Sequence, residues 1–144
     1  MNAERVFIDT NVLTYLFDFA EGDKQKRAER TLAEETREMF VSTQVLQELY
    51  VSLTKGKSPI ATSEVAEQAV HEASKYSVVH IDPALVFSAI EIARKHKISF
   101  WDALIVGAAA RADCGAVLSE DLNAGQIIEG VRIENPFAHG QRKR

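Results

Sequence analysis

Short apolar runs alternate with segments of helical periodicity along the chain, and this alternation restricts the fold more than any other feature of the sequence. Between the runs, apolar residues recur every three or four positions, as on one face of a helix. Short strands joined by helices favour a mainly parallel sheet with helices on both faces. We therefore predict an α/β three-layer sandwich with four to five short strands, near 6–8, 39–41, 78–81, 116–118 and 131–133.

Helix starts are marked by capping residues. Asp82 followed by Pro83 is typical of a first helical turn, because the aspartate caps free N–H groups and proline has none to satisfy. The segment 99–112 is apolar on nearly every side, which predicts a central helix packed against the sheet.

Composition indicates a single globular domain. The chain has 144 residues, of which 46% are hydrophobic and 26% are charged, enough to bury a core. We expect one domain over 1–138, followed by a basic, flexible tail at 139–144. Only one cysteine, Cys114, is present, and neither a signal peptide nor a stretch long enough to span a membrane is recognisable. These features favour the cytoplasm.

The charge balance limits how the chain can contact nucleic acid. Seventeen Lys and Arg against 21 Asp and Glu give a net charge of -4, so the overall field repels a polyanion. Any nucleic-acid contact must be local. The dense basic clusters, at 94–97 and 142–144, are expected to solvate a helix end and the tail.

Three acids stand alone in long uncharged stretches. Asp9 is the only charge in 6–17, Glu48 the only one in 41–54, and Asp102 the only one in 98–110. A fourth stretch, 114–128, is interrupted only by the adjacent acids Glu120 and Asp121. Carboxylates are rarely buried without partners, so each of these acids requires an explanation.

The positions of these acids point to a shared metal site. Asp9 and Asp121 follow predicted strands and Asp102 opens a helix, and ligands of open α/β sheets bind at the carboxyl ends of the strands. Carboxylates brought together there would repel one another unless a cation intervened. Oxygen ligands without a cysteine cluster favour Mg²⁺, with Mn²⁺ as the alternative.

Each acid also has a structural explanation. Asp9 can cap the following helix, Asp102 can complete a capping box with Ser99, and Asp121 can stabilise a turn. Glu48 lies off the centre of its helix's apolar face and is compatible with a solvated flank. The functional interpretation therefore depends on the four acids together.

Other polar and aromatic residues give weaker signals. The four histidines have no ligand-like spacing, which argues against a zinc site or a histidine base. Phe100 and Trp101 are expected in the core rather than as a platform for stacking bases. Gly107 and Gly115 do not fit either nucleotide-binding glycine pattern.

Four segments of the chain resemble the PIN-domain nucleases, and within them the VapC-like toxins of bacterial toxin–antitoxin pairs. The segments are FIDTNVLTYLFD, VSTQVLQELY around Glu48, SFWDALIVGAAARA around Asp102, and VLSEDLNAGQIIEGVRIENPF. The resemblance implies a PIN-like fold with Asp9, Glu48, Asp102 and Asp121 in an acidic catalytic site. It places Asp9, Asp102 and Asp121 as metal ligands. The residues expected to position these acids are Thr10, Asn11, Ser119 and Glu120. Because Glu120 is adjacent to Asp121, the fourth catalytic acid could be either of the two.

The resemblance further implies a Mg²⁺-dependent endoribonuclease with RNA as substrate, a cognate antitoxin protein as partner, and a homodimer. A PIN nuclease of RNA processing without an antitoxin remains the alternative. A phospho-receiver domain is disfavoured because 116–119 lacks the lysine that it needs, and an aspartate-nucleophile phosphatase because Asn11 stands where a second acid is required.

Overall fold

The computed structural model describes residues 2–138, so the predicted tail at 139–144 lies outside the described residues. Within them, one sheet has the strand order β3-β2-β1-β4-β6-β5. The strands are β1 (Asn2–Ile8), β2 (Glu38–Ser42), β3 (Ser77–Val79), β4 (Cys114–Leu118), β5 (Ile127–Ile128) and β6 (Val131–Glu134). The helices are α1 (Thr10–Tyr15), α2 (Gly22–Glu34), α3 (Thr43–Thr54), α4 (Ser63–Ala73), α5 (Pro83–His96) and α6 (Phe100–Arg111).

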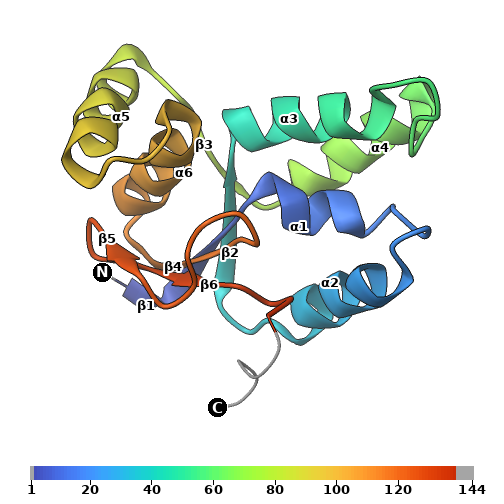
Figure 1. Ribbon diagram of the computed structural model, residues 1–144, viewed down its shortest axis with the longest axis horizontal. Coiled ribbons are helices and arrows are strands. Elements are labelled where there is room, and N and C mark those ends of the chain that lie inside the picture. The colour runs from blue at the N-terminus through green and yellow to red at the C-terminus, as the bar shows by residue number, and fades with distance from the viewer. Residues whose placement is uncertain (1, 139–144) are drawn as a thin grey trace.

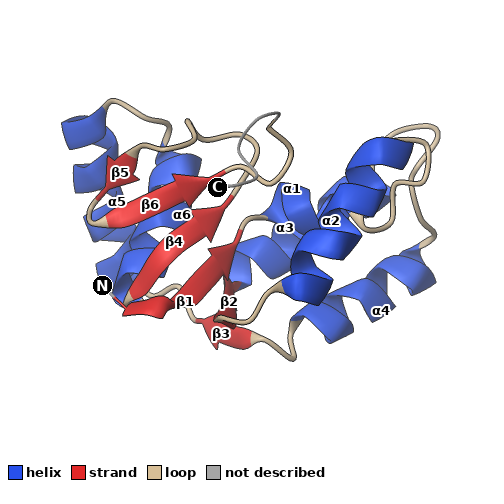
Figure 2. Ribbon diagram, turned by 90° about the horizontal axis from the view of Figure 1, so that it is seen from below, coloured by secondary structure: helices blue, strands red, loops and turns tan. Residues whose placement is uncertain are grey.

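The sheet is parallel from β3 to β6, and only β5 runs antiparallel to its neighbour. Helices connect most of the parallel strands, as parallel pairing requires. Figure 1 shows α5 and α6 together on one side of β1 and β4, with α1, α3 and α4 grouped beyond the ends of these strands. From below, the strands lie in front of α5 and α6, and α2 lies in front of α1 and α3 (Figure 2). The predicted α/β sandwich with helices on both sides is confirmed.

The core lies where β1 and β4 meet α6. Val6, Phe7 and Ile8 of β1 are fully buried, and α6 is buried on most of its circumference, as its apolar sequence predicts. Gly115 permits the close approach of β4 to the start of β1, since a Cβ there would lie 2.9 Å from the backbone oxygen of Asn2. This packing fixes the two central strands whose ends carry the candidate acids.

Five of the strands match the predicted runs within a few residues, but β5 was not predicted. It is only two residues long and is joined to β6 by Glu129 and Gly130, both with positive φ (52° and 80°). Two consecutive positive-φ residues are typical of a tight hairpin turn, but glutamate is unusual there, so the turn gave no clear signal in the sequence.

The predicted helix starts are confirmed. Asp82 caps α5 with a 2.9 Å hydrogen bond from the N–H of Leu85, and Pro83 follows it. The basic cluster at 94–97 lies at the end of α5, where Lys97 takes the left-handed conformation. None of the helices in 2–138 is long and apolar enough to span a bilayer.

Candidate active site

The candidate site lies where β1 and β4 end side by side. The chain builds the sheet outward from β1 to β2 and β3, and later returns to place β4 on the other side of β1. Such a change of direction is the point where open α/β sheets bind ligands. Asp9 directly follows β1, and its N–H donates to the Leu118 carbonyl at the end of β4 over 3.0 Å.

Asp9 is the central buried acid of this region, with 5% of its surface exposed. It caps α1, since its Oδ1 accepts the N–H of Thr10 at 2.7 Å. Its Oδ2 accepts the Ser119 hydroxyl at 2.7 Å and the Asn11 amide at 3.4 Å. The structure therefore confirms the capping interpretation of Asp9. The same fixed carboxylate faces the residues after β4.

Glu48 comes to this region from α3. Thr10 Oγ1 donates to Glu48 Oε1 at 2.7 Å, and Gln44 Nε2 donates to Glu48 Oε2 at 3.1 Å. Both oxygens are therefore held by neighbouring side chains, and Glu48 is not a freely solvated flank of its helix.

Asp102 and Asp121 reach the same region from α6 and from the loop after β4. The N–H of Asp102 donates to Ser99 Oγ at 3.0 Å, which is one half of the predicted capping box. Asn11 Nδ2 donates to Asp121 Oδ2 at 3.1 Å, and the N–H of Asp121 donates to Ser119 Oγ at 3.2 Å. Asn11 and Ser119 thus connect Asp9 to Asp121.

The four acids interact electrostatically. Burial raises the pKa of Asp9 from 3.8 to about 6, against hydrogen bonds from Ser119 and Thr10 that lower it, and the charges of Asp121 and Glu48 raise it further. Burial also raises the pKa of Asp102, with smaller contributions from Asp121 and Glu48. Mutual repulsion of this kind is what a bound cation would relieve.

The acids share this region but do not converge on one point. Within residues 2–138, no group of three or more His, Cys, Asp or Glu side chains is arranged closely enough to hold a metal ion. Instead, Ser119, Asn11, Thr10 and Gln44 hold the carboxylates individually. The donor atoms nevertheless fit a hard divalent cation, because the four acids offer carboxylate oxygens and no thiol or imidazole lies among them.

Glu120 has different partners from its neighbour Asp121. Its carboxylate accepts the Tyr15 hydroxyl at 2.7 Å and forms an ion pair with Lys24 at 2.6 Å. These contacts hold the pKa of Glu120 below its usual range, although partial burial acts to raise it. Only its backbone N–H reaches toward the acids, donating to Asn11 Oδ1 at 3.1 Å.

Sequence reasoning missed Gln44 and misplaced Trp101. Gln44 carries no charge and so gave no signal, although its position four residues before Glu48 places the two on one helix face. Trp101 was expected in the core, but 61% of its surface is exposed, while Phe100 is partly buried against the core. Because α6 is apolar on nearly every side, its sequence does not indicate that the first turn is exposed while the residues from Ala103 onward are buried.

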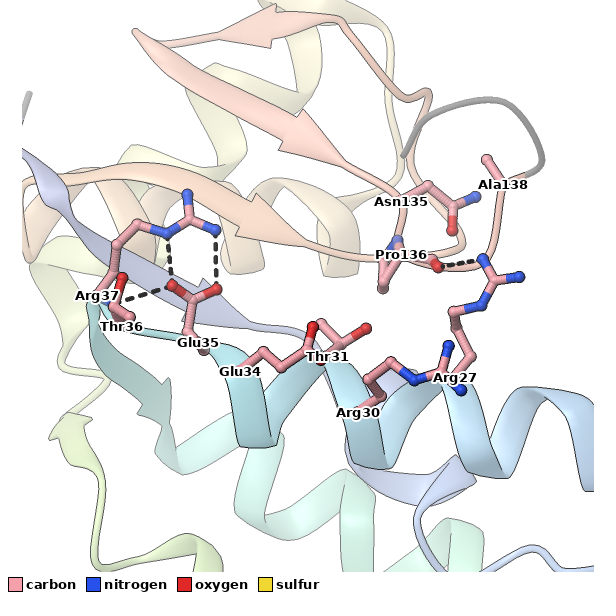
Figure 3. Close-up of a pocket in the computed structure, with 10 residues that line it drawn as sticks. All are labelled: Arg27, Arg30, Thr31, Glu34, Glu35, Thr36, Arg37, Asn135, Pro136 and Ala138. Carbon is pink, nitrogen blue, oxygen red and sulfur yellow. Dashed lines mark hydrogen bonds and ion pairs between the residues drawn. The ribbon is translucent and has the colours of Figure 1, made fainter. Parts of the chain in front are cut away.

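A second feature is a pocket between α2 and the segment after β6, lined by three arginines and by Glu34 and Glu35. Figure 3 shows Arg27 and Arg30 on α2 at one end of the pocket and Arg37, against Glu35, at the other. Arg37 is paired with Glu35 and Glu134, and Arg27 donates to the Pro136 carbonyl at 3.0 Å. Arg27 and Arg30, three residues apart on α2, therefore provide local positive charge, whereas Arg37 is paired with two glutamates.

The family model for the PIN domain matches residues 6–128, which include all four candidate acids. The chain belongs to the PIN domain family. This membership agrees with the predicted fold and with the resemblance seen in the four sequence segments.

Solved structures of similar fold come from bacterial toxin–antitoxin systems. One is Mycobacterium tuberculosis VapC20, a sarcin-ricin loop cleaving toxin, with a TM-score of 0.68, 23% identity, and coverage of 88% of this chain and 98% of that one. A toxin–antitoxin complex from Klebsiella pneumoniae has a TM-score of 0.70 and 17% identity, with 92% and 98% coverage. DNA-bound VapBC from Salmonella typhimurium has a TM-score of 0.63 and 24% identity, with the same coverages. No curated protein sequence gives a significant match.

Proposed function

We propose that this PIN domain is a divalent-metal-dependent endoribonuclease that acts as the toxin of a toxin–antitoxin pair. The observation that carries the proposal is that Asp9, Glu48, Asp102 and Asp121 lie in one region around the carboxyl ends of β1 and β4, linked by hydrogen bonds or by interaction of their charges. These acids lie far apart in the sequence, and each is the solitary charge or one of two adjacent charges in its stretch.

In this proposal Asp9, Asp102 and Asp121 hold Mg²⁺ or Mn²⁺, and Glu48 completes the site directly or through water. The cation would supply positive charge that polarises a phosphodiester and makes water more acidic at neutral pH. The raised pKa values of Asp9 and Asp102 support the assignment, because a cation would stabilise the charged forms that burial and mutual repulsion disfavour.

The remaining side chains would position these acids. Ser119 fixes one oxygen of Asp9, and Thr10 fixes one oxygen of Glu48. Asn11 donates to both Asp9 and Asp121 and would set the separation between them. Hydrogen bonds of this kind orient metal ligands in many metalloenzymes, and their loss typically lowers metal affinity or activity ~10- to 100-fold.

The RNA substrate is supported by the local positive surface. Arg27 and Arg30 of α2 line one pocket together with Lys24 and Lys26, and Lys24 contacts Glu120 next to Asp121. Basic side chains beside an acidic catalytic site can bind the phosphates flanking the scissile bond despite a net negative charge.

The toxin role is supported by the fold of the relatives, and it implies control by an antitoxin. An Arg or Lys of a small antitoxin protein could pair with the acids and keep the site inactive in the cytoplasm. We also propose a homodimer, because Tyr50 of α3 and Val65 of α4 are exposed apolar side chains on two helices that pack together. A processing nuclease without an antitoxin is the alternative within the same family.

The test of the nuclease proposal is cleavage of a structured RNA by the purified chain with Mg²⁺, with Mn²⁺, and with a chelator. We expect cleavage only with metal, and loss of cleavage in the Asp102→Asn variant. Glu91→Gln, an exposed acid on α5, is the matched control and should retain full activity. Equal cleavage in the chelator, or by Asp102→Asn, would contradict the proposal.

A further inference from the structure

Trp101 is the most unusual exposed side chain beside the candidate site. Trp101 directly precedes Asp102 in the sequence, and 61% of its surface is exposed. Phe100 packs edge-on against it, with ring centroids 5.0 Å apart, so the indole is supported on one side by an aromatic neighbour. An exposed aromatic ring presents a flat apolar surface that a binding partner can cover.

A pocket of about 460 Å³ lies between Trp101 and α3. Its α3 wall runs from Gln44 and Glu48 to Val51 and ends at Lys55, the residue that follows the helix. These positions recur every three or four residues and so form one helical stripe. The volume falls in the range of small-ligand sites, ~300–1,000 Å³.

The lining of this pocket offers three kinds of contact. Trp101 and Val51 provide apolar surface, Gln44 and Gln47 provide amides, and Lys55 provides a positive charge without an ion-pair partner in the described part of the chain. A nucleotide has the matching features, because its base has a flat face, its edges carry donors and acceptors, and its phosphate is negative.

Gln44 gives a second observation that points to a ligand. Its Nε2 donates to Glu48 Oε2 and to the Trp101 carbonyl at 3.3 Å, which fixes the amide orientation because both partners are acceptors. Its Oε1 is buried and accepts no hydrogen bond from any residue in 2–138. Buried acceptors normally have a donor, and the N–H of a nucleobase in the pocket could supply one once a small side-chain movement uncovers this oxygen.

We propose that Trp101 stacks on a nucleobase of single-stranded RNA beside the scissile phosphate, with Gln44 contacting the base edge and Lys55 the adjacent phosphate. This inference rests on the proposed ribonuclease function. The base next to the cleaved bond would occupy the pocket between Trp101 and α3. The arginines of α2 would contact other phosphates of the RNA. Gln44 connects this pocket to the acidic site, because its amide donates hydrogen bonds to both Glu48 and the Trp101 carbonyl.

The test uses the fact that Trp101 is the only tryptophan of the chain, so its fluorescence reports this pocket alone. An eight-nucleotide oligoadenylate is titrated into the full-length Asp9→Asn chain with Mg²⁺, so that the probe stays intact. The expected result is quenching by the oligoadenylate. An abasic ribose-phosphate oligomer of equal length and charge should quench little and bind more weakly.

Kinetics on the active chain provide the second readout. Trp101→Ala should raise KM for RNA roughly 5- to 150-fold, the effect of losing one stacked base, with a much smaller change in kcat. Trp101→Phe should restore most of the affinity and Trp101→Leu should not, because leucine is apolar but cannot stack. Phe87→Ala, which removes an aromatic ring that is 67% exposed on α5, is the matched control and should leave KM unchanged.

The outcomes separate this inference from the nuclease proposal. Cleavage with an unchanged KM in Trp101→Ala and no quenching would overturn the stacking role and leave the nuclease intact. Quenching without any cleavage by the wild-type chain would support the pocket and contradict the nuclease. If Trp101→Ala instead abolished self-association in sedimentation and left RNA binding unchanged, the pocket would be a protein interface and the inference would be wrong.

Discussion

Ser119 donates a 2.7 Å hydrogen bond to Asp9 although 110 residues separate them in the sequence. The bond is possible because β1 and β4 are neighbours and end at the same edge of the sheet. Ser119 is fully buried, and its hydroxyl also accepts the N–H groups of Asp121 and Leu122. One hydroxyl thus orients a buried acid after β1 and organises the loop that carries the acid after β4.

Ser119→Ala is expected to weaken metal binding and cleavage about 10- to 100-fold, because Asp9 loses the hydroxyl donor that fixes its Oδ2. The variant should also lose about 1–3 kcal/mol of unfolding free energy, since Asp9 Oδ2 keeps only the long contact from Asn11 and the N–H groups of Asp121 and Leu122 lose their acceptor. Titration calorimetry with Mg²⁺ and urea unfolding measure the two effects.

The control for Ser119→Ala is Ser42→Ala, which removes another fully buried serine hydroxyl. Ser42 caps α3 and accepts the N–H of Val45. It should lose about 1 kcal/mol of stability with a smaller effect on metal affinity. Equal losses of metal affinity in the two variants would mean that Ser119 acts only through stability.

Asp9 should make the metal-free protein less stable as the pH rises from about 4 to about 6. Its folded-state pKa is raised from 3.8 to about 6, so the folded state holds its proton more tightly than the unfolded state. The stabilisation from that proton is full below the unfolded value and is lost as pH rises through the folded value. Asp9→Asn should therefore gain up to ~3 kcal/mol of unfolding free energy at pH 7.

The gain of Asp9→Asn should vanish near pH 4, where the wild-type carboxyl is protonated when folded. It will be reduced at all pH values, because an amide cannot accept from both Ser119 and Thr10 as a carboxylate does. Chemical unfolding of both proteins in a chelator at pH 4 and pH 7 measures this difference. A variant that is less stable than the wild type at pH 7 by as much as at pH 4 would refute the burial cost of Asp9.

The fold could be predicted largely from the sequence because its signals are local. Short apolar runs and capping residues such as Asp82 act within a few positions, and they placed most strands and helix starts. β5 escaped prediction because its two residues depend on pairing with β6 and on an uncommon turn at Glu129. Pairing of that kind is decided by tertiary contacts rather than by local propensity.

The acids of the site could be predicted because each lies in an otherwise uncharged stretch. Their partners could not, because Ser119 and Gln44 are common uncharged residues that become distinctive only when strands and helices bring them to Asp9 and Glu48. Glu120 and Asp121 could not be distinguished either, because adjacent residues point in different directions that only the structure supplies. Glu120 turns away from the other acids because its partners are Tyr15 of α1 and Lys24 of α2.

Metal binding should separate these two adjacent acids. Mg²⁺ should raise the melting temperature of the wild-type chain, because a ligand that binds only the folded state stabilises it by mass action. Asp121→Asn should reduce this increase, whereas Glu120→Gln should preserve it, since Glu120 is paired with Lys24 and Tyr15. Thermal unfolding at a series of Mg²⁺ concentrations gives both results. A lost metal response in Glu120→Gln with a normal one in Asp121→Asn would reverse the assignment.

The toxin role predicts that induced expression of the chain arrests growth of a bacterial host, because uncontrolled RNA cleavage depletes transcripts or functional RNA. Asp9→Asn should be harmless at equal expression, since the fold is retained while the metal site is lost. Glu91→Gln, the exposed acid of α5, should be as toxic as the wild type. Growth curves, with RNA integrity and protein level measured in the same cultures, provide the comparison.

Co-expression of a small antitoxin protein encoded beside this gene should restore growth. The complex of the two proteins should weaken as the salt concentration rises, because the acids of the site attract a basic segment of the antitoxin. High-level expression of an RNA-cleaving wild-type chain without a growth defect would leave a PIN nuclease of RNA processing as the function.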